Sequence, residues 1–264
     1  EHRLAAPEVI DALRQLPRLE QRQHHAGSGG DEGQLLPELQ LEQFLVEDEL
    51  HELVDVGHRA GQAAEIGADV AIVVNPNYYK GQMTVPVLVR YYRDVADSSA
   101  IPILIYNLPP ATGMDLSADL LVELSHHPNI IGVKDTGGNM PKMGETIRRA
   151  DPAFQVLSGS ANFFYPSLAI GVTGGILALA NMAPDESVAL LDLFNAGRIQ
   201  EGRDLHLRML PANLAITSRF GVSGLKAALD MVGYYGGPPR LPLLPLDDER
   251  CQELQDILEA AKLL

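Results

Sequence analysis

Between residues 67 and 178, short apolar runs alternate with helix-like segments, and this alternation constrains the fold more than any other feature. The apolar runs lack a regular in-and-out pattern, so each predicts a strand buried on both faces, as in a parallel sheet. Strands that alternate with helices are typical of α/β folds. Five such units fit either a doubly wound sheet or part of a barrel, and periodicity alone does not separate the two. The expected strands are 68–74, 101–106, 130–134, 154–158 and 171–178, and the expected helices between them are 85–97, 117–125, 141–150 and 161–169.

Both ends of the chain differ from this pattern. Residues 1–62 hold five of the eight histidines but no Lys, Thr, Tyr or Asn, and no run there predicts a strand. We expect a short helix over 7–16, a Gly-rich loop over 24–33 and a helix over 42–66. The chain therefore divides into an atypical helical or loop segment, 1–62, and a strand-containing portion, 63–264. Further helices are predicted over 184–195, 198–217, 224–232 and 247–263.

Composition argues against several classes of protein. The chain has 264 residues, 46% of them apolar, which suits one barrel-sized domain. Its net charge of −15 repels a phosphate backbone, so we expect no nucleic-acid partner. One cysteine, Cys251, allows neither an intrachain disulfide nor a thiolate metal cluster. No apolar run approaches the ~18 residues of a membrane span, and the first residues show no signal-peptide pattern. We therefore expect a protein without membrane association, in the cytoplasm or the mitochondrial matrix.

Lys134 is the leading candidate for a catalytic residue. The chain has five lysines, at 80, 134, 142, 226 and 262, and only Lys134 ends an apolar strand. A lysine partly withdrawn from water loses stabilisation of its charge, and its neutral amine can attack a ketone to form an imine. The alternative is a strand-end lysine that pairs with Asp135 or reaches out to solvent. Residue type alone favours that alternative.

Tyr106 ends the preceding strand and is the second candidate. A phenol at this point can shuttle protons during imine formation, although many tyrosines simply bury the ring and leave the hydroxyl in water. Ligands of parallel α/β folds bind at the carboxyl ends of the strands. Because Tyr106 and Lys134 end neighbouring strands, the pair is more informative than either residue alone.

Glycine-rich turns follow the last two strands, at Ser158-Gly159-Ser160 and Gly174-Gly175-Ile176. Glycines there allow backbone N–H groups to approach a carboxylate, or simply allow tight turns. No G-x-G-x-x-G or P-loop pattern occurs, so nucleotide chemistry is unsupported. The pairs His24-His25 and His126-His127 lack ligand-spaced partners, so we expect no metal and no other cofactor.

Six segments together resemble the dihydrodipicolinate synthase / N-acetylneuraminate lyase family of class I aldolases, and most of all its 4-hydroxy-2-oxoglutarate aldolase branch. They run in the order of the family, from about residue 63 to the C-terminus. Each motif alone is weak, but the set is specific. The segments are GADVAIVVNPNYYKGQMT (67–84), IPILIYNLPPATGMDL (101–116), HPNIIGVKDTGGN (127–139), FQVLSGSANF (154–163), GVTGGILALANM (171–182) and RFGVSGLKAALDMVGYYGGPPRLPL (219–243).

This resemblance implies a (β/α)8 barrel with extra C-terminal helices, of which residues 63–264 would supply strands four to eight. It places Lys134 at the Schiff-base lysine and Tyr106 at the proton-shuttling tyrosine. It implies a 2-oxo acid substrate that contains a pyruvate moiety, and an assembly of four subunits or two. Further residues that it implies are Thr136, Ser158, Gly159 and Ile176 around the substrate, where backbone amides would help to orient the acid, and Tyr78 and Tyr79 in a loop near a neighbouring subunit's site.

Two departures from the family pattern bear on function. The synthase branch carries an arginine for a dicarboxylate product in its Y-N-x-P-x-R-T-G pattern, and Ala111 stands at that position here. The family also carries a G-[ST]-x-G-E turn on strand two, which holds the pyruvate carboxylate, and residues 1–62 show no such strand. The resemblance therefore favours cleavage of 4-hydroxy-2-oxoglutarate to pyruvate and glyoxylate. Synthase-type condensation and an inactive, incomplete barrel are the alternatives.

Overall fold

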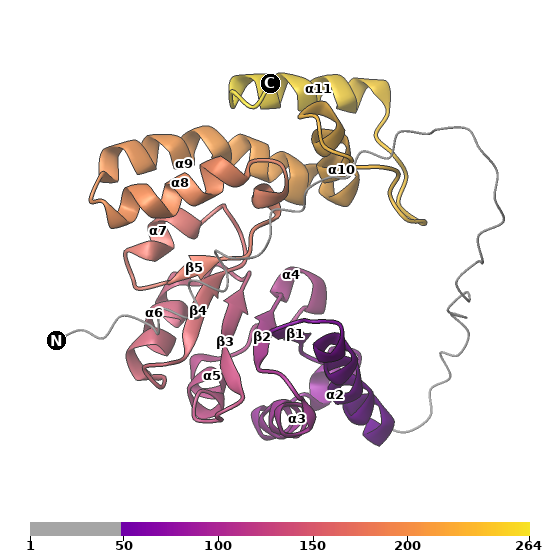
Figure 1. Ribbon diagram of the computed structural model, residues 1–264, viewed down its shortest axis with the longest axis vertical. Helices are drawn as coiled ribbons and strands as arrows, with labels where there is room; N and C mark the ends of the chain where they lie inside the picture. Colours follow the sequence, from indigo (N-terminus) through magenta and orange to yellow (C-terminus); the bar gives the residue numbers. More distant parts are fainter. Residues whose placement is uncertain (1–48) are drawn as a thin grey trace. The chain divides into compact units, whose positions relative to one another are not determined.

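Five parallel strands form the predicted sheet and lie side by side in chain order, β1 to β5 (Figure 1). The computed structural model describes residues 49–264. The helix expected over 7–16, the loop over 24–33 and the His24-His25 pair lie outside the described residues. The strands are β1 (Ala71–Val74), β2 (Ile103–Asn107), β3 (Ile130–Asp135), β4 (Gln155–Ser158) and β5 (Gly174–Gly175).

A helical segment follows each strand, which confirms the α/β class. The helices before and between the strands are α2 (Glu49–Glu65), α3 (Val85–Ser98), α4 (Pro109–Thr112), α5 (Ala118–Leu124), α6 (Met140–Arg149) and α7 (Phe164–Leu168), with a short turn η1 (Lys80–Gln82). The helices after β5 are η2 (Ala178–Asn181), α8 (Pro184–Asn195), α9 (Ile199–Leu214), the π-helical turn η3 (Ala215–Arg219), α10 (Gly221–Met231) and α11 (Asp248–Ala260).

Local sequence explains where several helices begin. The Ser117 hydroxyl accepts the N–H of Leu120 at 3.2 Å and so caps α5. The Asn139 side chain accepts the N–H of Lys142 at 3.1 Å, and a proline occupies the first turn of α6. These caps start α5 and α6 at fixed distances beyond the strands that precede them.

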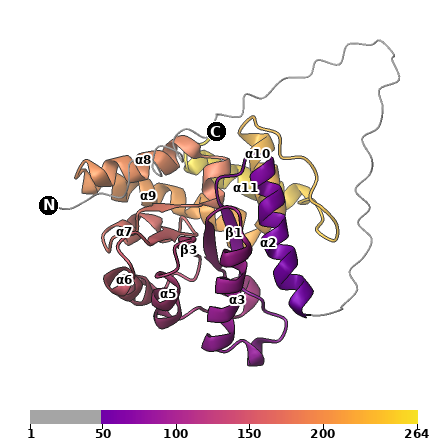
Figure 2. The same ribbon diagram turned by 60° about the horizontal axis from the view of Figure 1, so that its bottom comes forward.

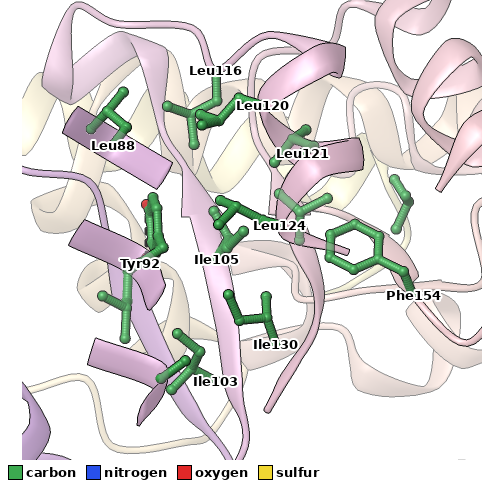
Figure 3. Packing of buried hydrophobic residues seen from close by; sticks show 14 of the residues in the cluster. Leu88, Tyr92, Ile103, Ile105, Leu116, Leu120, Leu121, Leu124, Ile130 and Phe154 are labelled. Carbon is green, nitrogen blue, oxygen red and sulfur yellow. Dashed lines mark hydrogen bonds between the residues drawn. The ribbon is translucent and has the colours of Figure 1, made fainter. Parts of the chain in front are cut away.

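One face of the sheet carries the main hydrophobic core. Ile103, Ile105 and Ile130 on the strands meet side chains of α3 and α5, among them Tyr92 and Leu124 (Figure 3). Most of these side chains are fully buried, and each full burial of a large apolar side chain contributes about 1.5–3 kcal/mol. The core therefore fixes which side chains of each strand face the helices and which face the other way.

A second core joins the segments that follow β4. Phe164 and Tyr165 of α7 pack with Leu190 of α8, Met209 of α9 and Leu254 of α11. The orange and yellow helices α8 to α11 gather around it (Figure 1). These are the extra C-terminal helices that the sequence predicts. None of the helices in the described part of the chain is long and apolar enough to cross a bilayer.

Among residues 49–264, the one strand that pairs with β1 is β2, so β1 is an edge of the described sheet. On this strand Val73 is 6% exposed and faces the core, whereas Ile72 is 46% and Val74 42% exposed on the opposite face. In a closed barrel that face points inward. The parallel strands and the helices between them agree with the predicted (β/α)8 fold class.

Several boundaries differ from those that the sequence predicts. The strand expected over 171–178 pairs with β4 only at Gly174–Gly175, because the chain then turns into η2. The helix expected over 198–217 is α-helical to Leu214 and continues as the π-helical turn η3. The expected division at residues 62–63 falls inside α2, which packs against α3 (Figure 2).

Candidate active site

One row of side chains crosses the sheet near the carboxyl ends of its strands. Val74, Tyr106, Lys134 and Leu157 are successive register partners of β1 to β4. Successive side chains of a strand point to opposite faces. Since Val73, Ile105, Val133 and Val156 face the helices, the row lies on the face of the sheet away from them. Tyr106 and Lys134 are therefore neighbours on one surface.

The amine of Lys134 lies over the ring of Tyr106, with its Nζ 4.1 Å from the ring centroid. Both side chains are half-buried. Within residues 49–264, neither Lys134 Nζ nor the Tyr106 hydroxyl makes a hydrogen bond or ion pair. The alternative prediction that Lys134 pairs with Asp135 is wrong, because Asp135 pairs with Lys142 at 2.7 Å instead. The structure thus brings the two candidate catalytic groups together and leaves both without a competing polar partner in this part of the chain.

Thr136 follows the β3 strand and packs tightly against Gly159. Its backbone N–H donates to Asn107 O at 2.9 Å. Its Oγ1 is buried and has no hydrogen-bond partner among the described residues. A Cβ on Gly159 would stand 2.0 Å from that Oγ1, so a glycine is required there. The hydroxyl therefore retains an unused hydrogen-bonding capacity two residues from Lys134.

Ser158 and Ile176 occupy the ends of the last two strands. The Ser158 hydroxyl donates to Ser160 O at 2.9 Å, and its side chain lies on the helix-facing side of the sheet. The N–H of Ile176 donates to Ser158 O at 2.9 Å, and that of Gly159 donates to Asp135 O at 2.7 Å. Because these two N–H groups are already bonded to backbone carbonyls, we do not assign them to a substrate carboxylate.

Tyr78 and Tyr79 lie in the exposed loop between β1 and η1. Their rings meet edge to face, with centroids 4.8 Å apart, and their exposed fractions are 86% and 50%. No contact in the structure joins them to Lys134. An exposed pair of aromatic rings suits contact with another protein surface.

A buried polar cluster behind the row is a feature that the sequence does not reveal. Asn107 follows Tyr106, and Asp135 follows Lys134, so both face the helices. There they meet Asp115 from the loop after α4 and Lys142 from α6. The adjacency of Asn107 and Asp135 to the candidate pair is the only signal of this cluster in the sequence.

Binding of a metal ion finds no support in the described residues, where no group of three or more His, Cys, Asp and Glu side chains is arranged to hold one. Two hollows of about 420 and 780 Å³ lie between α9, α10, α11 and the segment before α11. Neither hollow is lined by a candidate site residue.

The family model described as the dihydrodipicolinate synthetase family matches residues 52–261. The chain belongs to this family. Among its curated relatives in the family is a 4-hydroxy-tetrahydrodipicolinate synthase of Methanothrix thermoacetophila, 37% identical over 74% of this chain and 66% of that protein. A mitochondrial protein of Emericella nidulans, described as a probable 4-hydroxy-2-oxoglutarate aldolase, is 38% identical over 74% of this chain and 63% of that protein.

Solved structures of the family agree with this membership. Dihydrodipicolinate synthase of Acinetobacter baumannii, crystallised in complex with pyruvate, superimposes with a TM-score of 0.73 at 28% identity. The match covers 79% of this chain and 71% of that one. The chain thus spans about two thirds of the length of the first two curated relatives. This agrees with a sheet that holds five of the barrel's strands.

Proposed function

We propose that this family member acts as a class I aldolase that binds its 2-oxo acid as a Schiff base on Lys134. The observation that carries the proposal is the position of the Lys134 amine, 4.1 Å from the Tyr106 ring centroid and without an ion-pair partner in the described residues. An amine beside a phenol is a suitable arrangement for imine formation. The pyruvate complex of the Acinetobacter relative supports a pyruvate-type substrate.

The proposed reaction needs no group beyond the side chains and water. The Lys134 amine attacks the C2 carbonyl carbon, and the carbinolamine loses water to become an iminium ion. The C4 hydroxyl gives up its proton as the C3–C4 bond breaks, and the bond electrons move toward the iminium nitrogen. This releases an aldehyde and leaves an enamine, which is protonated at C3 and hydrolysed to pyruvate. Tyr106 would carry the protons of these steps.

The substrate favoured by the sequence is 4-hydroxy-2-oxoglutarate, whose cleavage gives pyruvate and glyoxylate. Ala111, an exposed residue of α4, stands where the synthase branch carries its arginine. The relative from Emericella nidulans supports the aldolase reading. The relative from Methanothrix thermoacetophila supports condensation of pyruvate with an aldehyde as the alternative.

A product assay separates these activities. The aldolase proposal predicts that 4-hydroxy-2-oxoglutarate yields pyruvate and glyoxylate in equal amounts, and that Lys134→Ala abolishes both. Lys226→Ala is the matched control, because the Lys226 amine donates to Gly236 O and lies outside the row. Undiminished turnover in Lys134→Ala would refute the assignment. Turnover only when pyruvate and an aldehyde are supplied would favour the synthase.

An inactive partial barrel is a second candidate, supported by the exposure of Ile72 and Val74 on β1. It predicts a broad thermal transition that pyruvate does not move. The aldolase predicts a cooperative transition that rises with pyruvate, because a ligand that binds only the folded state stabilises it.

We also propose a homotetramer or dimer, in which the exposed Tyr78 and Tyr79 contact a neighbouring subunit. Light scattering on the wild-type protein and on a Tyr78→Ser/Tyr79→Ser variant tests this. We expect a multiple of the 28.6 kDa chain that falls in the variant. A wild-type monomer would contradict the assembly.

A further inference from the structure

A polar cluster lies directly behind the candidate catalytic pair. It consists of Asn107 of β2, Asp135 of β3, Lys142 of α6 and Asp115 of the intervening loop. Asn107 is 0% and Asp135 1% exposed, and the side chain of Lys142 is 8% exposed, whereas that of Asp115 is 41% exposed at the edge of the cluster. Buried polar groups of this kind are costly unless every one of them is bonded, so their pairing is under strong constraint.

Asn107 joins the two acids. Its Nδ2 donates to Asp115 Oδ1 at 2.8 Å and to Asp135 Oδ2 at 3.0 Å. Its Oδ1 accepts the N–H of Leu116 at 3.0 Å. Both ends of this amide are therefore occupied, which fixes its orientation.

Lys142 completes the cluster from the first turn of α6. Its Nζ lies 2.7 Å from Asp135 Oδ2 and also contacts Asp115 Oδ1. The other oxygen of Asp135 accepts the N–H of Gly137 at 2.8 Å. Both oxygens of the Asp135 carboxylate are thus bonded. The positive charge that balances the carboxylate is Lys142 of α6.

The cluster also fixes the strand ends that carry the candidate pair. Asn107 and Asp135 are register partners, immediately beyond the partners Tyr106 and Lys134. At the other end of the same two strands the register shifts between Ile103 and Leu104. The hydrogen bonds and ion pairs of the cluster therefore hold together the ends of β2 and β3 that carry Tyr106 and Lys134. The pairing of the same two strands is irregular where they begin.

We propose that Lys142 is a positioning residue, which ties the ends of β2 and β3 together and neutralises Asp135 so that Lys134 is left free as a nucleophile. The role of Lys134 as a nucleophile rests on the proposed function, whereas the arrangement of the cluster does not. Without Lys142, the buried charge of Asp135 would stand one residue from Lys134 with no cation to balance it. A nearby uncompensated carboxylate favours the protonated form of an amine, which is not nucleophilic.

Other charged groups around α6 are paired at the surface or lie farther along the chain. Lys80 of η1 lies beside Gly113, just before the cluster. The remaining charges of α5 and α6 form exposed pairs, namely Glu123–Arg93, Asp119–Arg149, Glu145–Arg148 and Glu145–Arg149. Lys142 is therefore the cation that contacts Asp135 in the described part of the chain.

The test measures the protonation of Lys134 directly, by the rate at which acetic anhydride labels its peptide as pH is varied. In Lys142→Met we expect the midpoint of this profile to rise by about one pH unit. At any pH below the midpoint, Lys134 of the variant should then be labelled roughly tenfold more slowly than Lys134 of the wild type. Lys142→Arg should keep the wild-type midpoint, and Asp135→Asn/Lys142→Met should restore it. Lys226, labelled in the same samples, is the internal control.

If Lys142→Met does not fold, the same labelling measurement on Asp135→Asn tests the proposal instead. This variant removes one of the two carboxylates around Lys142 and leaves its amine paired with Asp115 alone. The negative charge behind Lys134 is then smaller, so the midpoint of Lys134 should fall. Unchanged midpoints in folded variants, or shifts opposite to these, would overturn the proposal. Labelling requires no pyruvate, so a wild-type protein that forms no pyruvate adduct would refute the proposed function and leave this result standing.

Discussion

Tyr106 and Lys134 occupy adjacent positions in one row of the sheet, and strand alternation explains why the sequence predicts this pair. Alternation also places Asp135 on the opposite face from Lys134, so the ion pair between sequence neighbours does not form. The partner that Asp135 takes instead, Lys142, lies on the following helix. Its contact depends on how α6 packs on the sheet, which no local pattern reveals.

Removal of the Tyr106 hydroxyl tests its role as a proton carrier. Tyr106→Phe keeps the ring beneath the Lys134 amine and removes only the phenol. We expect Schiff-base formation with pyruvate to slow by about 100-fold or more, the usual contribution of a general acid or base. Stopped reactions reduced with borohydride at set times give the rate, and Tyr235→Phe, at an 82% exposed ring, is the control. An unchanged rate would remove Tyr106 from the mechanism.

The contact between Thr136 and Gly159 predicts a cost for any side chain at position 159. The Cβ of Gly159→Ala would meet Thr136 Oγ1 at 2.0 Å and Asp135 O at 2.9 Å. We expect the free energy of unfolding to fall by about 1–3 kcal/mol, as for other overpacked sites. Gly144→Ala on α6 meets nothing within 4 Å and should be neutral or stabilising by up to about 1 kcal/mol. Equal effects of the two variants in urea titrations would contradict this packing.

At the scale of elements, apolar runs and caps predict most of the strands and helices. The Ser117 cap locates α5, and the buried runs locate β1 to β4 to within a few residues. The fifth run is apolar over 171–178, yet β5 is only Gly174–Gly175. The apolar composition of 171–178 predicts that this segment is buried. It does not reveal how many of its residues pair with the neighbouring strand. The π-helical turn at the end of α9 likewise arises from packing.

Stability near neutral pH should depend on His206 of α9. Its ring stacks on Tyr165 at 6.1 Å between centroids, and burial lowers the pKa of His206 below its ordinary value. An unfolded histidine, with a pKa of about 6.5, then binds a proton before the folded one does. The free energy of unfolding should therefore decline as pH falls below about 6.5, until the lower folded pKa is passed.

The variant His206→Phe keeps the stacked ring and cannot be protonated. It should show a smaller loss of stability between pH 7 and pH 5, an interval of about two units around the ordinary histidine pKa. His126→Gln, at an exposed position, should leave the slope unchanged. Denaturant titrations at several pH values provide the measurement. A variant with the full wild-type slope would exclude His206 as the cause.

For the molecule as a whole, the five strands carry the candidate lysine and tyrosine, while β1 is an edge of the sheet that residues 49–264 form. Ile72 and Val74 are exposed on the face that a closed barrel turns inward. The family's strand-two turn, with its carboxylate-binding role, has no counterpart among residues 49–264. The resemblance predicts the nucleophile and the phenol because these belong to the strands that are present. It leaves the group that binds the substrate carboxylate unassigned.

The most direct measurement is the mass of the protein after incubation with pyruvate and borohydride. The account predicts one reduced three-carbon adduct, located on the peptide that contains Lys134. Lys134→Ala should carry none, and Lys226→Ala should carry the full amount. An adduct that persists in Lys134→Ala, or a folded wild-type protein that gains none, would contradict the account.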